Sequence, residues 1–402
     1  MSGIVRIDGV VRDYAWGRPG GISAARGQEP GDGPEAELWL GAHPAAPSRV
    51  LTDHPGDPPW PDLAAWEDAT GDTLPFLMKL LAAGAPLSLQ AHPGLEQARA
   101  GFAREEAAGI PRDAPTRSFR DPHAKPEVLL AVEDGFDALC GFRPVAEVVD
   151  LLDRLEARVP ADGWSRWRSL LAGAGAGAGS PAAGAGAALR WLLSGDEAVD
   201  RMVDALSGGR PTGLPEAEDD LVRLLARHHP GDPGIAVALM LNRVTLAAGE
   251  ALWLPAGNIH AYLSGLGVEV MGPSDNVLRG GLTGKHVDVP ELLEVLDFTP
   301  GPPPRLAPVD LAPAVRAYRP STQETGAGVP WQLVEVTGPA EMAVGRAAVA
   351  LVLKGEFTLR TGRHGDPDGG LTLARGEAGF VERPGRLQVQ GSGALYLATT
   401  VS

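Results

Sequence analysis

The sequence predicts a mainly β fold of jelly-roll or sandwich type, interrupted by one helical insertion. The chain has 402 residues, and its 53 glycines and 37 prolines favour frequent turns over long helices. Short runs of strand-forming residues bounded by Gly and Pro recur towards both ends of the chain. The middle of the chain instead repeats apolar residues at helical spacing.

The first predicted domain joins two parts of the chain, residues 1–143 and 234–300. The first part contains the strand-like runs GIVRIDGVV, AELWLGA, LSLQAH and EVLLAV, separated by turn clusters. In the second part, GEALWLPAGNIHAYL is typical of a strand, a turn and a further strand, and ELLEVLDF (291–298) of one short helix. We expect the two parts to build one jelly-roll domain.

The predicted helical insertion occupies residues 144–233. The segment VAEVVDLLDRLEARV, which begins at Val145, places apolar residues near the helical period, and two later segments share this pattern. Three or four helices are therefore expected. Between them, the Ala/Gly-rich stretch 169–193 contributes little transfer free energy and is interrupted by Pro181. We expect a flexible connector with helical flanks there, rather than a membrane span.

A second, C-terminal jelly-roll-like β domain is predicted for residues 301–402. It begins with a Pro-rich segment, FTPGPPPRLAPVDLAP. Apolar and polar residues then alternate through WQLVEVTG, AAVALVLKGEFTLR and RLQVQGSGALYLATT, as in half-buried strands.

Composition excludes several classes of protein. The 35 Lys and Arg against 51 Asp and Glu give a formal net charge of −16, whereas a general nucleic-acid binder needs a basic face. The single cysteine, Cys140, cannot form an intrachain disulfide, which fits a reducing compartment. Charged residues at Arg6 and Asp8 break the apolar core that a signal peptide needs. We expect a cytoplasmic monomer without membrane or nucleic-acid partners.

Four residues on strand-like segments could bind one metal ion. Gln90 and His92 are two residues apart, so on a strand both side chains point to the same face. Glu127 follows His92 by 35 residues at the start of another strand, and His260 comes after the helical insertion. Two imidazoles, a carboxylate and an amide oxygen suit Zn²⁺ first, and Mn²⁺, Co²⁺ or Fe²⁺ less well. Taken alone, a histidine beside a polar residue, as in Gln90 and His92, is more often just hydrogen-bonded, and Glu127 is more often a solvated charge at a strand end.

The stretch VEVMGPSDNVLRGGLTGKH suggests a site for an anion. Arg279 and Lys285 would focus positive potential locally in an otherwise acidic protein. The glycines between them would let the backbone approach a ligand closely. The alternative is a turn with an exposed arginine. The stretch is not a Walker A loop, because His286 follows Lys285 where Ser or Thr is required.

Taken together and in order, these segments resemble type I mannose-6-phosphate isomerases. The resemblance rests on LPFLMKLL, LSLQAHP, KPE, FDALCGFRP, LPAGNIHAYL and SDNVLRGGLTGKHVDV, with YAWG and AELWLGAHPAAPS near the start of the chain. It spans about residues 12–300, and the C-terminal third matches by layout alone.

The resemblance implies a cupin enzyme that binds one Zn²⁺ and interconverts mannose 6-phosphate and fructose 6-phosphate. It implies Gln90, His92, Glu127 and His260 as the metal ligands. The family's other site residues correspond to Arg279, Glu269, Ser88 and Trp16 and to the motif lysines Lys79, Lys125 and Lys285. We expect Arg279 to stabilise the developing oxyanion, Lys285 and Ser88 to bind the phosphate, and Lys79 to support the pocket.

One departure from the family pattern leaves the proton carrier open. The family reads His-Lys-Pro-Glu where this chain has Ala124-Lys125-Pro126-Glu127, with His123 displaced by one position. The candidates for the base are Glu269, Lys125 and His123, and we prefer Glu269. Two alternative functions also stay open: a cupin enzyme acting on a different phosphorylated sugar, and a sugar-phosphate sensor without catalysis.

Overall fold

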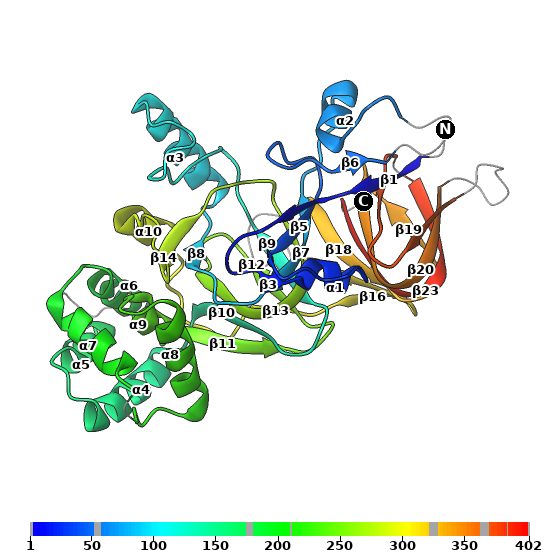
Figure 1. Ribbon diagram of the computed structural model, residues 1–402. Helices are drawn as coiled ribbons and strands as arrows, with labels where there is room; N and C mark the ends of the chain where they lie inside the picture. The colour runs from blue at the N-terminus through cyan, green and yellow to red at the C-terminus, as the bar shows by residue number, and fades with distance from the viewer. Residues whose placement is uncertain are drawn as a thin grey trace.

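A computed structural model of the protein describes residues 3–51, 58–173, 180–209, 211–320, 329–361, 370–383 and 385–400. Two large antiparallel sheets dominate it, one of 11 strands and one of 10, and a group of helices lies at one end (Figure 1). These features confirm the predicted mainly β fold class with a helical insertion and a C-terminal β region. Among the described residues, no helix is both long and apolar enough to cross a membrane.

The 11-stranded sheet, which we call the central sheet, takes its strands from both sides of the helical insertion. Its main path runs β15-β12-β9-β13-β7-β5-β2, and β8, β10, β11 and β14 branch from it. The strands are β2 (Val10–Arg12), β5 (Glu37–Leu40), β7 (Leu77–Ala83), β8 (Leu89–Ala91), β9 (Glu127–Ala131), β10 (Phe136–Phe142), β11 (Leu241–Leu246), β12 (Ala251–Leu254), β13 (His260–Met271), β14 (Leu278–Gly281) and β15 (Arg305–Leu306).

The 10-stranded sheet, which we call the C-terminal sheet, runs β16-β17-β18-β23-β20-β22-β1-β6, with β19 and β21 beside β23 and β20. Its strands are β1 (Ile4–Asp8), β6 (Arg49–Val50), β16 (Val309–Ala312), β17 (Val315–Tyr318), β18 (Trp331–Val336), β19 (Ala340–Val344), β20 (Ala348–Thr361), β21 (Leu371–Ala374), β22 (Ala378–Val381) and β23 (Gly385–Thr400). A separate pair joins β3 (Arg18–Pro19) to β4 (Pro34–Glu35).

The first strand of the chain belongs to the C-terminal sheet. Strand β1 pairs with β22, with Ile4 opposite Val381, and on its other edge with β6. The sequence analysis grouped this strand with the rest of residues 1–143, because strand-forming residues alone do not reveal the pairing partner. The division of the chain into domains stays a prediction, and the hydrogen bonds tie its N-terminal strand to its C-terminal region.

The two sheets pack face to face around a shared apolar core. Trp60 and Trp66 lie edge-on to the ring of Phe380, with ring centroids 6.0 and 4.9 Å away. Helix α2 (Leu63–Thr70) holds Trp66 there, and Asp62 caps that helix by accepting a hydrogen bond from the Ala65 amide. The core also contains, from the central sheet, Leu38, Met78, Leu80, Val128 and Val268, and from the C-terminal sheet Leu333, Val349, Leu351 and Ala398.

The insertion contains more helices than expected. Within the described part of residues 144–233, five helices gather at the end of the molecule opposite the C-terminal sheet (Figure 1). They are α4 (Val145–Arg158), α5 (Trp164–Leu171), α6 (Pro181–Leu192), α7 (Glu197–Ser207) and α8 (Glu216–His228), and the short α9 (Gly234–Ala238) follows them. The other helices are α1 (Gly21–Ala25), α3 (Leu95–Ala107) and α10 (Val289–Val295), the last of which the sequence predicted a few residues later.

The helical flanks expected at the two ends of residues 169–193 are present, but the second helix begins earlier than predicted, at Pro181. Pro181 does not interrupt structure there; it is the first residue of α6, where its missing N–H costs nothing, and Ser180 caps the helix. At Gly184 a Cβ would come within 2.4 Å of the Leu171 carbonyl oxygen, so the glycine allows α5 and α6 to pack closely. Residues 174–179 of the predicted connector lie outside the described residues.

Truncating Phe380 should test the shared core. Because its ring is buried between the two sheets, we expect Phe380→Ala to lower the free energy of unfolding by about 3–5 kcal/mol. Urea denaturation followed by tryptophan fluorescence measures this change. Val309, which is 48% exposed on β16, provides the control, and Val309→Ala should change stability by no more than about 0.5 kcal/mol. Equal effects of the two variants would contradict a core common to both sheets.

Candidate metal centre

Strand β13 organises the candidate centre because it changes partners along its length. Its first residues pair with β8 and β10, and His260 stands opposite Gln90. From Gly265 onward it pairs with β7 and β9. Gly265 has a φ of 128°, and a Cβ there would come within 2.6 Å of the Phe136 ring, so the position requires glycine. The change of partners lets side chains from β8, β9 and β13 converge.

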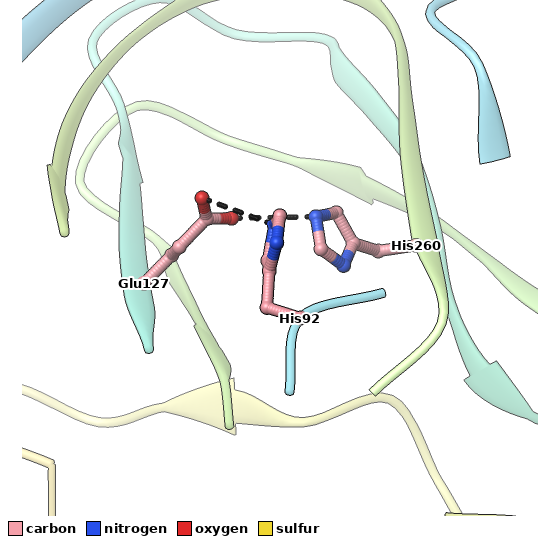
Figure 2. Close-up of side chains that lie close together, drawn as sticks. All are labelled: His92, Glu127 and His260. Carbon is pink, nitrogen blue, oxygen red and sulfur yellow. Dashed lines mark ion pairs between the residues drawn. The ribbon is translucent and has the colours of Figure 1, made fainter. Parts of the chain in front are cut away.

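Three buried side chains meet at this point. His92 follows β8, Glu127 is the first residue of β9, and His260 is the first residue of β13. Their ligand atoms all lie within 4.8 Å of one another, and Figure 2 shows the carboxylate facing both imidazoles. Glu127 Oε1 is 3.4 Å from His92 Nε2, and its Oε2 is 3.3 Å from His260 Nε2. The amide nitrogen of Gln90 lies 3.3 Å from His260 Nε2.

Hydrogen bonds on the far side of each ring orient the two imidazoles. His92 Nδ1 lies 2.6 Å from the carbonyl oxygen of Asn276, and His260 Nδ1 lies 3.1 Å from that of Asn258. A carbonyl can only accept, so each Nδ1 carries the proton and each Nε2 directs a lone pair towards Glu127. This is the usual arrangement of histidines that bind metals.

Among the described residues, the cluster of His92, Glu127 and His260 leaves buried polar atoms without partners, and a bound cation would supply one. Within the described part of the chain, His92 Nε2 and Glu127 Oε2 are buried atoms without a hydrogen bond. Buried polar atoms are normally paired, so convergent unpaired lone pairs indicate a missing positive partner. Two imidazole nitrogens and a carboxylate, with an amide alongside, match the ligand preferences of Zn²⁺.

Local electrostatics keep His92 and Glu127 in their metal-binding forms. Burial, reinforced by the charge of Lys125, lowers the pKa of His92 to about 4, so this ring is neutral near pH 7. Burial by itself would raise the pKa of Glu127, but Lys125 and the two histidines outweigh it and hold that pKa well below its usual range. Lys125 is buried, and its Nζ lies 3.0 Å from Glu127 Oε1.

A second buried ionic group adjoins the first. Lys79 Nζ lies 3.2 Å from Glu37 Oε1 and 3.2 Å from Glu269 Oε2. The remaining carboxylate oxygens are also bonded, because Trp39 donates to Glu37 over 2.7 Å and Tyr262 donates to Glu269 over 2.8 Å. Burial and the neighbouring charge of Glu127 raise the pKa of Glu269. This group is internally satisfied, which suits a supporting role.

Positive charge also collects around Arg279, next to the predicted ligand Gln90. Arg279, on β14, stands opposite Gln90, on β8, so the two side chains leave the sheet on the same face. Its Nε is buried and makes no hydrogen bond within the described residues. Burial and the nearby Arg120 lower the pKa of Arg279, and burial, Arg279 and Arg120 lower that of Lys285. The three cations are therefore near neighbours that repel one another, and an anion bound among them would relieve this repulsion.

The remaining predicted residues lie at different distances from the cluster. Ser88 is half-buried, directly before β8, and two residues from Gln90 on the same face. Trp16 is half-buried against the apolar core beside β7 and stacks on Tyr14, with ring centroids 5.8 Å apart. His123 has an exposed side chain, and its backbone binds Asp121, Ser274 and Asn276. The metal-ligand cluster does not include it.

The sequence analysis did not identify several residues that contribute to the site. Tyr262 had a usable signal, because it lies two residues after His260 and shares its face of β13. Arg120 and Glu37 had none, since each reaches the site through contacts with residues far away in the chain. Asn258 lies only two residues before His260, and its carbonyl oxygen accepts from His260 Nδ1, so its place in the turn was a usable local signal. Asn276 belongs to the stretch VEVMGPSDNVLRGGLTGKH, but the sequence analysis assigned it no role.

Comparisons with known proteins identify the relatives of this chain. The family model described as "Phosphomannose isomerase type I, catalytic domain" matches residues 4–145. Mannose-6-phosphate isomerase of Escherichia coli (strain K12) is 36% identical over 309 residues, covering 73% of this chain and 74% of the relative. Mannose-6-phosphate isomerase of Bos taurus is 32% identical over 387 residues, covering 87% of each.

Solved structures extend the similarity to the whole chain. A crystal structure of mannose 6-phosphate isomerase bound with zinc and yttrium matches with a TM-score of 0.81 at 30% identity, over 100% of both chains. The apo form from Salmonella typhimurium matches with a TM-score of 0.80 at 30% identity, again over 100% of both. The helical insertion and the C-terminal sheet are thus shared as well, and the chain belongs to the mannose-6-phosphate isomerase family.

Proposed function

We propose that this protein is a zinc-dependent aldose–ketose isomerase that interconverts D-mannose 6-phosphate and D-fructose 6-phosphate. The observation that carries this proposal is the buried His92–Glu127–His260 cluster, whose unpaired lone pairs converge beside the cationic side chains of Arg279, Lys285 and Arg120. The names of the relatives and the zinc bound in one of the matching structures support the choice of substrate and metal. A monomeric, cytoplasmic state, without nucleic-acid or membrane partners, is part of the same proposal.

Gln90, His92, Glu127 and His260 would hold the metal. Once bound, Zn²⁺ would act as a Lewis acid that stabilises negative charge developing on the sugar oxygens. The neutral form of His92 and the ionised form of Glu127, both favoured by their surroundings, leave the ligand atoms free of protons. Tyr262 and Lys79 would keep the Glu269 side chain fixed behind the cluster.

The isomerisation needs a group that moves a proton between C2 and C1 of the sugar through an enediol(ate). Lys125 is the better placed of the three candidates, because its Nζ contacts the ligand Glu127 directly. Both oxygens of Glu269 are engaged by Lys79 and Tyr262. His123 has an exposed side chain outside the ligand cluster. The geometry therefore favours Lys125 over the earlier preference for Glu269.

Arg279, which the sequence analysis assigned to the developing oxyanion, would instead bind the phosphate of the substrate together with Lys285 and Arg120. An arginine with a buried, unpaired Nε has a donor available without breaking an internal ion pair. Ser88 would add a hydroxyl from the same face as Gln90. Trp16 would form part of the pocket wall, and Lys79 would support the site from within.

A sugar-phosphate sensor without catalysis is the second candidate. Ala124 replaces the histidine of the family pattern, and the neighbouring His123 side chain is exposed. Such a sensor would be stabilised by the sugar phosphate against heat but would not convert it.

Removing and restoring the metal tests the proposed reaction. We expect purified protein to convert mannose 6-phosphate to fructose 6-phosphate, to lose this activity with a chelator and to regain it with Zn²⁺, because the ligand cluster binds the Lewis acid. A coupled assay for fructose 6-phosphate measures turnover. Folded, zinc-loaded protein that is stabilised by mannose 6-phosphate without converting it would support the sensor and contradict the isomerase.

Substituting Lys125 tests the proton carrier. Lys125→Met keeps much of the side-chain volume but cannot exchange a proton, so kcat should fall by about 10²–10⁴-fold. Glu269→Gln, which retains its shape and one acceptor oxygen, is the matched comparison and should fall less. Zinc content is measured in both variants, so that lost metal is not mistaken for lost proton transfer. The reverse order of effects in zinc-loaded variants would assign the proton to Glu269.

Substituting Arg279 tests the phosphate site. A charge-assisted hydrogen bond contributes about 1.5–3 kcal/mol, so Arg279→Gln should lower kcat/KM by roughly 10- to 100-fold, mainly through KM. The inhibition constant for inorganic phosphate should rise in parallel. Arg99→Gln, at an exposed position on α3, is the control for a lost surface charge and should change neither constant. An unchanged phosphate inhibition constant in Arg279→Gln would place the phosphate elsewhere.

A further inference from the structure

We propose that Asn276 is the positioning residue of the metal centre, joining the backbone that orients His92 to the segment that delivers Lys125 and Glu127. This inference rests on the proposed function, because it assigns Asn276 its role through the metal ligands. Asn276 lies in the turn between β13 and β14 and is fully buried, with 0% of its surface exposed.

The main chain of Asn276 acts on one ligand. Its carbonyl oxygen accepts the hydrogen bond from His92 Nδ1 over 2.6 Å, which directs the lone pair of Nε2 towards Glu127. A shift of this carbonyl would turn the ring or release its tautomer. The position of the Asn276 backbone therefore decides how well His92 is prepared for a metal.

The side chain of Asn276 acts on a different segment, residues 120–123. Its Oδ1 accepts from the amides of Arg120 and Asp121, over 2.7 and 3.2 Å. Its Nδ2 donates to the carbonyl oxygens of Asp121 and His123, over 2.8 and 2.9 Å, and approaches Asp121 Oδ1 at 3.3 Å. The same segment continues through Lys125 to Glu127, which begins β9.

Among side chains of this length, only asparagine offers this set of bonds. The site needs an acceptor for two amides and, on the adjacent atom, a donor for two carbonyls, which the planar amide of asparagine supplies. Ser274 completes the arrangement, because its hydroxyl accepts from the backbone N–H of Asn276 and donates to the His123 carbonyl, each over 3.2 Å. Asn276 thus joins segments more than 150 residues apart in the chain.

The decisive variant is Asn276→Asp, which has the same shape and keeps an acceptor. It replaces the Nδ2 donor by an oxygen that faces two carbonyls and the Asp121 carboxyl group, so the segment should be pushed away. We expect the dissociation constant for Zn²⁺ to rise by about 10- to 100-fold, as for other partners of metal ligands. Competition with a chromogenic zinc chelator measures this constant, and the visible spectrum of the Co²⁺-loaded protein reports altered ligand geometry.

Asn242→Asp is the matched control. The Asn242 amide is also buried and donates to three backbone carbonyls, those of Cys140, Gly141 and Gly301, but to no metal ligand. It should lower stability without a comparable change in zinc affinity or in the Co²⁺ spectrum. Equal weakening of zinc binding by Asn242→Asp and Asn276→Asp would overturn the proposal, since general loss of stability would then explain both.

A milder variant keeps the test decisive if Asn276→Asp does not fold. Ser274→Ala removes one support of Asn276, and a smaller weakening of zinc binding in the same direction is expected. Unchanged zinc affinity in Ser274→Ala, or in folded Asn276→Asp, would overturn the role of Asn276. Failure of the wild-type protein to bind Zn²⁺ would instead overturn the proposed function itself. Wild-type binding with unaffected variants would overturn this inference alone.

Discussion

The arrangement of the site depends on the burial of one carboxylate, that of Glu127. An isolated carboxylate away from water is strongly destabilising, so positive or hydrogen-bonding groups must face it. Lys125 and His92 meet Oε1, whereas Oε2 faces His260 and makes no hydrogen bond within the described part of the chain. The compensation is therefore incomplete in one direction, and a cation bound between the two imidazoles would complete it.

Comparison with the Lys79 group shows why burial of charge does not by itself indicate a metal. Glu37 and Glu269 are buried, as Glu127 is, yet Lys79, Trp39 and Tyr262 give each of their four oxygens a partner. None of these four oxygens is left without a partner. The Lys79 group, whose carboxylate oxygens all have partners, supports the central sheet. The cluster around Glu127 keeps polar atoms that are unpaired among the described residues and can therefore bind a ligand.

What could be predicted from the sequence was set by local spacing. Gln90 and His92 share a face because they are two residues apart on a strand, and the helical insertion follows from its periodicity. The other ligands, Glu127 and His260, were weak candidates until the ordered motifs suggested a family. The pairing of β1 with β22 and the contacts of Asn276 with residues 120–123 are long-range, so no local pattern could reveal them. Pro181 was misinterpreted because proline breaks helices internally but favours their first turn.

The charge distribution separates two tasks within the proposed site. At a net charge of −16 the protein repels a sugar phosphate at long range, so attraction has to come from the short-range group of Arg279, Lys285 and Arg120. Arg279 is half-buried, and a charge in such a position interacts more strongly with an anion than an exposed one does. Its opposition to Gln90 across β14 and β8 would fix the proposed phosphate site relative to the proposed metal ligands. The phosphate group would thus supply the attraction, and the ligand cluster would discriminate by the sugar atoms that reach it.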